Sequence, residues 1–406
     1  MSALRRRSGR HARPGRSLKW LNTVGLTLSG AATLLVAGSY FSGVHLVGQA
    51  TTYDVSDQLG DRPEQVVITP SPTATGSSDP QDVATGKPVN ILLMGSDVRT
   101  GDNAALGGAG KVTGMRNDTT IIMHISGDRT RVELVSIPRD SRVKIEDCLL
   151  SDGRTIRGWT GKFNIAFANG GKGGAGDAAA CTIRTVEALT SIFIDHYVVV
   201  DFTGVINIVN SLGGVPMCIP NNVRSDKAGL NLKAGPQVLN GYNALAYARL
   251  RTADNKDSGV NGSDLQRIER QQDLIAAIME KVLSQDTLTD VGKITNVLDA
   301  TFESMTMDPE LANFNYIVGL AYSLKDIDPD NITFATVPWE YTDDFLDVLW
   351  VEPAATQMFD DIRYDRGITG TTVASSSHAG DVDNEIPGVP VEVDVDVNEQ
   401  LLGACD

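Results

Sequence analysis

The feature that constrains this chain most is a long stretch without charged residues close to its N-terminus. Between Trp20 and Tyr53 there is no Asp, Glu, Lys or Arg, and the most apolar part is Trp20–Phe41. That part matches the roughly 20 residues that a helix needs to cross a bilayer. A basic flank on its N-terminal side only predicts that the N-terminus stays inside and that everything after the helix lies outside.

A cleaved signal peptide is the competing interpretation of this stretch. The apolar core of a signal peptide is about 7–15 residues long, and no small-residue cleavage site fits the sequence here. We therefore expect an uncleaved transmembrane helix over residues 20–42, preceded by a basic cytoplasmic segment over residues 1–19. The protein is then a single-pass protein of the cell membrane with an extracellular body.

The part of the chain that follows is strongly acidic. The first 53 residues carry a formal charge of +7, so a whole-chain charge of −16 leaves −23 for residues 54–406. Nucleic-acid binders present a basic surface, and this charge argues against that class. It also makes any cluster of arginines within the body unusual.

All four cysteines follow the apolar stretch: Cys148, Cys181, Cys218 and Cys405. None of them forms a C-x-x-C pair, which disfavours zinc or thioredoxin-type chemistry. An even number in an exported domain predicts disulfides. Of the three possible pairings we favour Cys148–Cys181, which leaves Cys218–Cys405 to tie back the C-terminal tail.

Composition divides the exported part into three segments. Residues 43–87 are rich in Pro, Ser, Thr and Gly, which is typical of an extracellular linker. The body is expected over residues 88–362. Residues 363–406 are expected to form an acidic, largely disordered tail that a disulfide would tie back.

Strands and helices alternate along the body. The predicted strands cover residues 89–95, 119–125, 131–137, 196–202, 215–219 and 332–337, the second and third joined as a hairpin by Gly127-Asp128. The predicted helices cover residues 182–193, 203–212, 240–248, 264–283, 309–324 and 351–362, with Ser263 and Gln266 as a capping box for the longest. Residues 150–177 are Gly-rich and are predicted to be loops. This order predicts a layered α/β/α fold with a central mixed β-sheet.

Several kinds of catalytic chemistry lack the residues that they need. His124 and His196 each lie in or beside a predicted strand, where a structural imidazole is the better interpretation. There is no G-x-S-x-G elbow, no H-E-x-x-H helix and no Walker loop. Serine hydrolase and zinc chemistry are therefore unsupported.

Charged side chains instead gather at the ends of predicted strands. Asp97 and Arg99 follow the first strand, Arg116 and Asp118 precede the second, and Arg139 follows the third. Ligands of open α/β sheets bind at the carboxyl ends of strands. We therefore expect these side chains to surround one ligand.

Further basic side chains lie on predicted helices. Arg249 and Arg251 follow the helix at residues 240–248. On the long helix, the spacing i, i+3, i+4, i+7 places four residues on one face: Arg267, Arg270, Gln271 and Leu274. The opposite side is expected to face the core and carries Leu265, Ile268 and Ile275.

Pairing with nearby acids would explain any one of these arginines as a surface residue. As a set they would repel one another unless they bound an anion, and the planar guanidinium suits phosphate oxygens. Two nearby carboxylates suit Mg²⁺. Arginines, aspartates, Mg²⁺ and a diphosphate together are the components of phosphoryl transfer.

The charged motifs, taken in order, resemble the LytR-CpsA-Psr family. They are GSDVR (95–99), RNDTT (116–120), SIPRDS (136–141), KFNIAF (162–167), YARLR (247–251) and DLQRIERQ (264–271). The resemblance runs from about Val89 to Leu283 and more weakly to about residue 360. The optional C-terminal module of the family is not evident in the tail.

The resemblance implies an Mg²⁺-dependent phosphotransferase that moves a glycopolymer from a polyprenyl pyrophosphate carrier to peptidoglycan or to a surface protein. Asp97 and Asp118 would hold Mg²⁺. We assign the pyrophosphate contacts to Arg99, Arg116, Arg139, Arg249, Arg251, Arg267, Arg270 and Gln271. The polyprenyl tail would occupy an apolar tunnel between the sheet and the helices.

The expected catalytic residues are Asp97, Asp118 and Arg139. An acceptor hydroxyl would attack the glycan-side phosphorus in line, and Asp118 or Asp97 would accept its proton. Arg139 would stabilise the transition state. Two alternatives remain open: a polyprenyl pyrophosphate phosphatase that uses water at the same site, and a non-enzymatic protein that binds the lipid carrier or regulates its use.

Overall fold

The computed structural model describes residues 51–65, 82, 84, 86–97, 115–262, 264–284, 292, 297, 302–328, 331–344 and 346–368. Its centre is a mixed sheet of seven strands in the order β1-β14-β9-β2-β3-β4-β15. In that order the strands are Thr51–Thr52, Met305–Met307, His196–Val200, Val89–Ser96, Asn117–Ile125, Val132–Ile137 and Ile332–Thr336. The predicted mixed sheet is confirmed, since β2 pairs parallel with β9 and antiparallel with β3.

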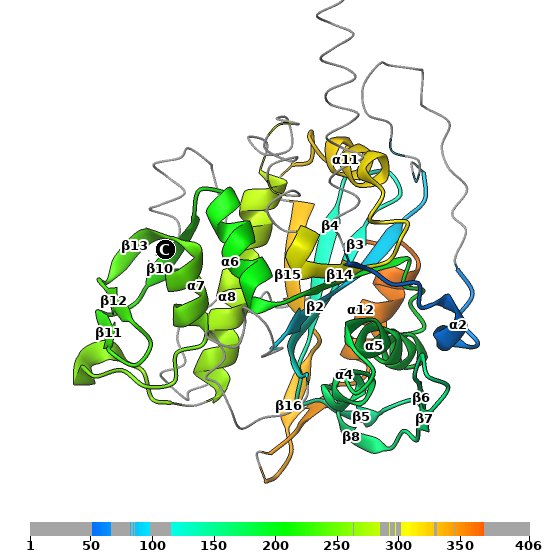
Figure 1. Ribbon diagram of the computed structural model, residues 1–406, viewed down its shortest axis with the longest axis horizontal. Coiled ribbons are helices and arrows are strands. Elements are labelled where there is room, and N and C mark those ends of the chain that lie inside the picture. The colour runs from blue at the N-terminus through cyan, green and yellow to red at the C-terminus, as the bar shows by residue number, and fades with distance from the viewer. Residues whose placement is uncertain are drawn as a thin grey trace, which may run out of the picture. The chain divides into compact units, whose positions relative to one another are not determined.

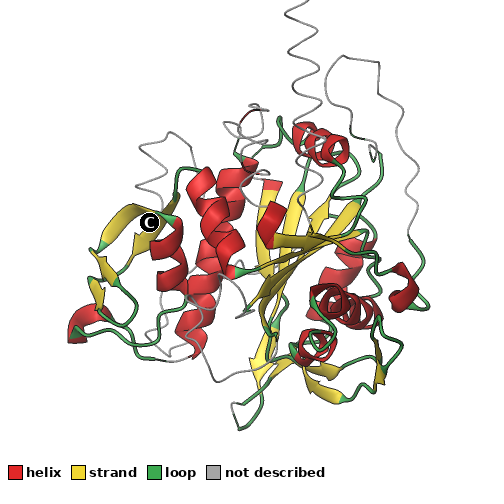
Figure 2. Cartoon of the chain, viewed as in Figure 1, coloured by secondary structure: helices red, strands yellow, loops and turns green. Residues whose placement is uncertain are grey.

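Helices cover the two faces of this sheet (Figure 1). One layer contains α4 (Ile165–Gly170), α5 (Ala175–Thr190) and α12 (Ala354–Arg363). The other contains α6 (Phe202–Ser211), α7 (Gly241–Ala248) and α8 (Asp264–Leu283). The predicted α/β/α layering is therefore confirmed, and Figure 2 shows the strands between the two groups of helices.

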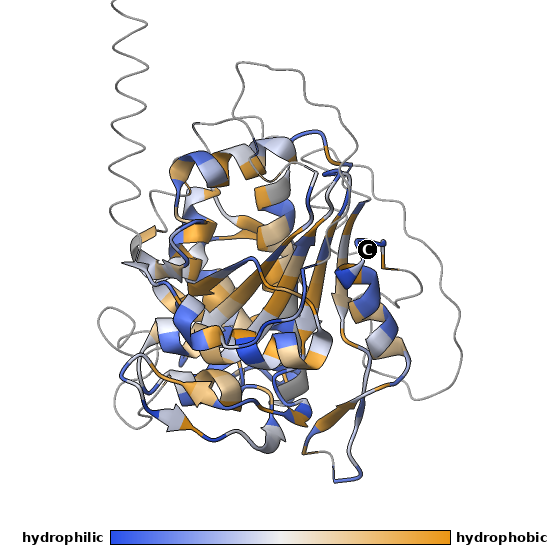
Figure 3. Cartoon of the chain, turned by 90° about the vertical axis from the view of Figure 1, so that its right-hand side faces the viewer, coloured by the Kyte–Doolittle hydropathy of each residue, from blue (hydrophilic) through white to orange (hydrophobic). Residues whose placement is uncertain are grey.

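Two of the apolar clusters among the described residues form the main cores. The first lies between the sheet and the α5 layer and includes the fully buried Leu92, Ile122 and Phe167. Figure 3 shows the strands of the sheet coloured mostly as hydrophobic. The second core joins α6, α7 and α8 to short β-pairs and includes Val209 and Val215.

The remaining elements are short. The small strands are β5 (Arg142–Lys144), β6 (Cys148–Leu149), β7 (Thr155–Ile156), β8 (Thr160–Lys162), β10 (Val215–Ile219), β11 (Val223–Ser225), β12 (Leu230–Leu232), β13 (Gly235–Leu239), β16 (Trp339–Tyr341) and β17 (Val348–Trp350). The other helices whose bounds lie within the described residues are α2 (Ser56–Leu59), α11 (Phe314–Ser323), and the 3₁₀ helices η1 (Lys256–Ser258) and η2 (Phe302–Ser304).

The prediction that residues 150–177 are loops was wrong in part. It contains β7, β8 and α4, and α5 begins at Ala175, seven residues before the predicted start at Thr182. The glycines that suggested a loop instead allow close packing. A Cβ at Gly170 would lie 2.1 Å from the backbone carbonyl oxygen of Asp177, so only glycine lets α4 approach α5 this closely.

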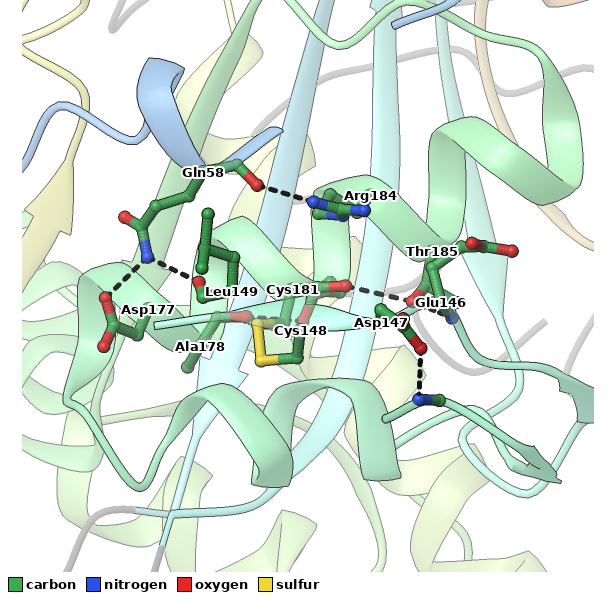
Figure 4. Close-up of a disulfide and its surroundings, with 12 residues drawn as sticks. Gln58, Glu146, Asp147, Cys148, Leu149, Asp177, Ala178, Cys181, Arg184 and Thr185 are labelled. Carbon is green, nitrogen blue, oxygen red and sulfur yellow. Dashed lines mark hydrogen bonds between the residues drawn. A yellow bond between two sulfur atoms is a disulfide. The ribbon is translucent and has the colours of Figure 1, made fainter. Parts of the chain in front are cut away.

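The predicted linker, residues 43–87, must also be corrected, because residues 51–65 pack onto the body. β1 adds an edge strand to the sheet, and α2 packs against α5. The side chain of Gln58 is buried and donates hydrogen bonds to Asp177 and to the carbonyl of Leu149 (Figure 4). Arg62 pairs with the buried Glu187 on α5. Val55 and Leu59 of this segment are buried in the main core as well, so hydrogen bonds and apolar packing both hold it, which the Pro/Ser/Thr content did not reveal.

Other predictions fall outside the described residues. Among the residues that the structure describes, no helix is both long and apolar enough to span a bilayer. The predicted anchor at residues 20–42 and the tail beyond residue 368 are not among them, and neither is Ser263. Gln266, its predicted capping-box partner, bonds to the amide of Asn261 and the carbonyl of Gly259 in the preceding loop.

The predicted disulfide between Cys148 and Cys181 is confirmed. Both residues are buried, their Cα atoms are 5.0 Å apart, and the bond joins β6 to α5 (Figure 4). Cys218 is also disulfide-bonded. Its predicted partner, Cys405, lies outside the described residues.

Both histidines of the body have structural roles, as predicted. The ring of His196 bonds to Asp308 and to the hydroxyl of Tyr316, which ties β9 to the end of β14 and to α11. The ring of His124 bonds to Asn90 on β2 and to Asp365, which follows α12. Each imidazole therefore joins separate elements of the fold.

Removing the Cys148–Cys181 disulfide should destabilise the body. The bond closes a loop with a sequence separation of 33 residues, and the chain-entropy model gives about 3 to 4 kcal/mol for such a loop. The double variant Cys148→Ala, Cys181→Ala should lower the free energy of unfolding by that amount in urea-dependent proteolysis. A loss below about 1 kcal/mol would contradict this role of the bond.

The charge of Asp365 should stabilise the fold in a pH-dependent manner. Burial alone would raise the pKa of this carboxyl, but hydrogen bonds from His124, the Gly127 amide and Arg131 outweigh it and lower the pKa to about 2. The ionised form therefore favours the folded state, and its contribution is lost as the pH falls from about 4 towards 2.

The variant Asp365→Asn isolates this charge, because Asn also tolerates the positive φ of 50° found here. We expect it to lower the free energy of unfolding by about 1 to 2 kcal/mol at pH 7. The difference from the unmodified protein should shrink steeply as the pH approaches 2 in urea titrations at each pH. A difference that is independent of pH would show that the carboxylate charge is not responsible.

Candidate active site

The predicted charged residues of three motifs meet at one edge of the sheet. β3 pairs antiparallel with both β2 and β4. The end of β2, the start of β3 and the end of β4 therefore lie at the same edge of the sheet. It carries Asp97, Arg116, Asp118 and Arg139. Arg99 lies outside the described residues.

Asp97 is held in place by a backbone bridge to Arg116. Its amide donates to the Arg116 carbonyl over 2.9 Å, and the Arg116 amide donates to Asp97 Oδ1 over 2.7 Å. The strand register shifts between Gly95 and Ser96, which is the kind of irregularity that redirects side chains next to active sites. Asp97 is only 8% exposed, whereas Arg116 is exposed.

Arg139 forms an ion pair with Asp118. Its Nη1 donates to Asp118 Oδ1 over 2.6 Å, and its Nε donates to Asp140 Oδ2 over 3.2 Å. The Arg139 side chain is 14% exposed and that of Asp118 is 30% exposed. These two hydrogen bonds fix the plane of the Arg139 guanidinium at this edge of the sheet.

The network continues through Asp140, which follows Arg139 after the third predicted strand, to Lys162 and Asp347, which the sequence did not single out. Lys162 Nζ donates to Asp140 Oδ1 over 3.0 Å and lies 3.3 Å from Asp347 Oδ1. Partial burial lowers the pKa of Lys162, but the hydrogen bond and charge of Asp140 and then Asp347 outweigh it and raise the pKa overall. Lys162 and Asp140 belong to the KFNIAF and SIPRDS motifs and could have been found there. The position of Asp347 depends on the β16–β17 hairpin, and no sequence pattern marked this residue.

A second group of basic residues approaches the same edge from the helical layer. The Arg249 guanidinium lies 4.1 Å from the centre of the Phe202 ring. Phe202 begins α6 immediately after β9, and Val200 of β9 pairs with Gly95 of β2. Arg249 is thereby held near the end of β9, the strand whose last residue pairs with Gly95 of β2. Arg251 lies in the exposed segment after α7.

The arginines of α8 are buried. Arg267 is 6% exposed and Arg270 is 8% exposed. Arg270 donates to the carbonyl of Leu250, which ties α8 to the segment between Arg249 and Arg251. Burial raises the pKa of Tyr247, beneath Arg270, to about 12, although the Arg270 charge opposes the rise. The buried Oε1 of Gln271 has no hydrogen-bond partner among the described residues.

The prediction about which side of α8 faces the core was wrong. Leu274, Ala277 and Ile278 are buried on the same side as the arginines, whereas Ile275 is partly exposed. The side chains of Leu265 and Ile268 lie outside the description. The arginine face of α8 is therefore the face that packs against the second core.

The donor set at the edge of the sheet fits Mg²⁺. Asp97 and Asp118 supply carboxylate oxygens, which this hard cation prefers. Among the residues that the structure describes, no group of three or more His, Cys, Asp and Glu side chains is arranged to hold a metal. Mg²⁺ commonly binds through one or two carboxylates together with substrate phosphates, so two aspartates meet that requirement.

One face of the central strands carries apolar side chains that are only partly buried. Leu93, Met123, Val198 and Val200 all lie on the face opposite Leu92, as the register of β2, β3 and β9 shows. Leu92 belongs to the fully buried core beneath α5. Partly exposed apolar residues in the middle of a sheet indicate an apolar binding surface next to the charged edge.

Comparisons with known proteins agree on one protein family. The LytR_cpsA_psr family model matches residues 47–364. Cell wall biosynthesis protein LcpA of Corynebacterium glutamicum is 31% identical over 271 residues, which are 61% of this chain and 49% of LcpA. Polyisoprenyl-teichoic acid–peptidoglycan teichoic acid transferase TagU of Halalkalibacterium halodurans is 32% identical over 231 residues, 57% of this chain and 64% of TagU.

The chain thus spans between about half and two thirds of the length of these two relatives. A crystal structure of ywtF from Bacillus subtilis superposes with a TM-score of 0.50 at 20% identity, over 78% of this chain and 99% of that one. This likeness shows a shared mixed α/β fold.

Replacing Arg270 should weaken anion binding. The variant Arg270→Met removes a buried charge and the bond to Leu250 that positions the neighbouring arginines. We expect the dissociation constant for inorganic pyrophosphate with Mg²⁺ to rise about 10- to 100-fold in calorimetry, as expected for the loss of one charge-assisted hydrogen bond. Arg154→Met is the matched control, because the side chain of Arg154 is 64% exposed. Equal affinities in both variants would contradict a role for the α8 arginines.

Proposed function

Because the chain belongs to the LytR-CpsA-Psr family, we propose that it transfers a glycopolymer from a polyprenyl pyrophosphate carrier to a cell-wall acceptor through a phosphodiester bond. The acceptor is peptidoglycan or a surface protein. The observation that carries this proposal is the meeting of Asp97, Asp118 and Arg139 at one edge of the sheet, beside Arg249. The printed name of the relative TagU describes a transferase of this class.

The pyrophosphate lies between the sheet edge and α8 in this proposal. Arg116 and Arg139 contact it from the strand ends, and Arg249 and Arg251 contact it from the end of α7. Arg267, Arg270 and Gln271 close the site from α8. These groups come from an otherwise acidic body. The planar guanidinium group of each arginine can donate two hydrogen bonds to the oxygens of a diphosphate.

Asp97 and Asp118 hold Mg²⁺ in this proposal. Bound there, the ion neutralises charge on the diphosphate and on the leaving phosphate. The backbone bridge between Asp97 and Arg116 and the ion pair between Asp118 and Arg139 fix both carboxylates before substrate binds. Such preorganisation avoids rearrangement during the reaction.

The polyprenyl chain lies along the partly exposed apolar face of the sheet. Leu93, Met123 and Val198 supply contacts along that face, and Val200 adjoins the charged edge. Each CH₂ group that leaves water contributes roughly 0.8 kcal/mol. This placement brings the diphosphate to the edge and the tail to the interior between the sheet and the α6 layer.

The acceptor hydroxyl attacks the phosphorus that carries the glycan. A new P–O bond forms, and the bond to the bridging oxygen breaks, so polyprenyl phosphate departs with the electron pair. The hydroxyl proton passes to Asp118 or Asp97 and then to solvent. Arg139, oriented by Asp118 and Asp140, stabilises the negative charge that develops on the phosphoryl oxygens.

We also propose that the protein is anchored in the cell membrane by residues 20–42, with the catalytic domain outside the cell. The uncharged stretch and its basic N-terminal flank support this arrangement. The confirmed disulfide supports an oxidising compartment for the body. The lipid-linked donor resides in the same membrane.

A transfer assay with Arg139→Ala tests the proposed function. The full-length protein in detergent receives a polyprenyl-pyrophosphate oligosaccharide, Mg²⁺, peptidoglycan fragments and a surface protein, and mass spectrometry identifies the products. We expect a phosphodiester-linked glycan on one acceptor and none with EDTA. Turnover should fall about 100-fold with Arg139→Ala, which corresponds to about 3 kcal/mol for one charged transition-state contact.

The matched control is Arg142→Ala, three residues further along the chain, because Arg142 is exposed on β5. It should retain normal turnover. Near-normal turnover in folded Arg139→Ala would show that the assigned role is wrong. Free glycan phosphate in the presence of acceptor would favour the phosphatase, and tightly bound, unchanged donor would favour a binding protein.

A further inference from the structure

We propose that one basic lobe of the body docks on the anionic lipid headgroups of the membrane. We define this basic lobe as residues 141–172, which contain β5, β6, β7, β8 and α4. The inference rests on the proposed anchor and function, and it adds the surface that orients the body on the bilayer. The partner is the layer of negatively charged phosphates at the lipid surface.

The basic lobe differs in charge from the rest of the body. Residues 141–172 contain six Lys and Arg residues and three Asp and Glu residues, which gives a net charge of +3. Since residues 54–406 carry −23, the rest of the body carries −26. An anionic lipid surface attracts basic segments and repels acidic ones. The body therefore has one part that such a surface attracts.

Two cations of the basic lobe are exposed and unpaired. The side chains of Arg157 and Lys172 have no ion-pair or hydrogen-bond partner among the described residues. The three acidic residues of the lobe each have another partner, namely Lys144, Arg154 and the amide of Gly158. The charges of Arg157 and Lys172 are therefore available to an anionic surface.

The basic lobe also exposes a large aromatic side chain. Trp159 lies between Arg157 and β8 and is 47% exposed. A Cβ at Gly161 of β8 would lie 2.9 Å from the indole nitrogen, so one edge of the ring rests on that strand while much of the ring meets solvent. Tryptophan is enriched at membrane interfaces, where its amphipathic ring sits at the level of the headgroups.

The neighbouring β16–β17 hairpin limits the area of contact. Lys162 of β8 donates to the carbonyl of Leu346 over 2.7 Å, so the hairpin adjoins the basic lobe. Its turn carries the exposed carboxylates of Asp343 and Asp344. An anionic surface repels these two charges, and the contact is therefore confined to the lobe itself.

The chain that follows the proposed anchor packs directly on the basic lobe. The Gln58 side chain donates to the carbonyl of Leu149 in β6 over 2.9 Å (Figure 4). Asp177 accepts hydrogen bonds from Gln58 and from the amide of Ser151, and so joins the same two segments again. The basic lobe is therefore fixed to the segment that would emerge from the membrane.

The entering chain and the basic lobe both adjoin the charged edge of the sheet. Thr51 and Ser96 line one cavity of about 300 Å³, and Asp97 follows Ser96 directly. β5 begins at Arg142, three residues after Arg139. In Figure 1, β5 and β8 lie below α4. Docking of the lobe therefore brings the charged edge close to the lipid surface, where a membrane-bound diphosphate is found.

The connection to the anchor cannot orient the body alone. Residues 43–50 join the proposed anchor to β1, and eight residues span no more than about 29 Å. A connection of this length keeps the body near the bilayer but lets it rotate. Attraction between the basic lobe and anionic lipids selects one orientation, because the rest of the body is acidic.

The test measures the accessibility of individual lysines in the full-length protein. The protein is studied in detergent, in vesicles of phosphatidylcholine, and in vesicles of phosphatidylcholine and phosphatidylglycerol in equal parts. A membrane-impermeant amine reagent labels the lysines, and mass spectrometry gives the labelling rate of each. Lys144 and Lys172 report on the basic lobe. Lys227 and Lys233, which are exposed beside β12, are the matched controls.

We expect the mixed vesicles to slow the labelling of Lys144 and Lys172 at least about fivefold, the effect of one basic residue near an anionic surface. Vesicles of phosphatidylcholine alone should not slow it. The control lysines should react equally fast in all three samples. Salt at about 1 M should restore the labelling of the basic lobe, because the Debye length falls to about 3 Å.

A pair of double variants tests the charges directly. Arg157→Gln with Lys172→Gln removes the two unpaired cations and should weaken docking on the order of 25-fold, about fivefold for each. Lys144 should then react in mixed vesicles as fast as in detergent. The matched control, Lys227→Gln with Lys233→Gln, removes the same charge elsewhere and should leave Lys144 protected.

Equal labelling of Lys144 and Lys172 in the two kinds of vesicle would overturn the inference, as would equal protection of Lys227 and Lys233. Slow labelling of the basic lobe already in detergent would show that another part of the chain, such as the acidic residues 369–406, covers it, and would also overturn docking on lipid. A polyprenyl-pyrophosphate oligosaccharide and peptidoglycan fragments added to the same vesicles report transfer. Protection without transfer would contradict the proposed function alone, and transfer without protection would contradict the docking alone.

Discussion

The site depends on the antiparallel pairing of β2, β3 and β4. This pairing returns the chain to one edge of the sheet twice, so that residues separated by about twenty positions meet there. Asp97, at the end of β2, is held by the backbone of Arg116, and Asp118, at the start of β3, is held by Arg139 at the end of β4. Each charged side chain is therefore positioned by a strand that carries another. A shift of one residue in either register would turn the side chains to the other face and separate the pair.

The site also needs the arginines of the helical layer, because of the balance of charge at the strand ends. The strand ends bring two carboxylates and two arginines, which nearly compensate one another, whereas α7 and α8 bring arginines into a partly buried place. Arg270 holds the Leu250 carbonyl, and Arg249 rests on Phe202 at the start of α6. These contacts attach the basic group to the end of β9. Arginines of an acidic body thereby gather where a diphosphate would bind.

The sequence predicted most of this arrangement because its signals were local. Continuous apolar runs predicted β2 and β9. Two β-rich runs joined by a Gly127-Asp128 turn predicted the β3–β4 hairpin, and charged residues marked the strand ends. It did not predict the start of α5, because glycines such as Gly170 that permit helix packing resemble loop glycines. It also missed Asp347, whose contact with Lys162 depends on a hairpin about 180 residues away along the chain. On α8, helical periodicity found the arginine face but could not reveal that this face is the buried one.

The segment of residues 51–65 changes how the body relates to a membrane. A linker over residues 43–87 would let the body move far from the bilayer. Because β1 is already part of the sheet, at most eight residues would separate it from the proposed anchor at residues 20–42, and eight residues span no more than about 29 Å. Thr51 of β1 also lines the cavity beside Asp97. If residues 20–42 anchor the protein as proposed, this short connection would hold the charged edge of the sheet near the membrane surface where a lipid-linked substrate resides.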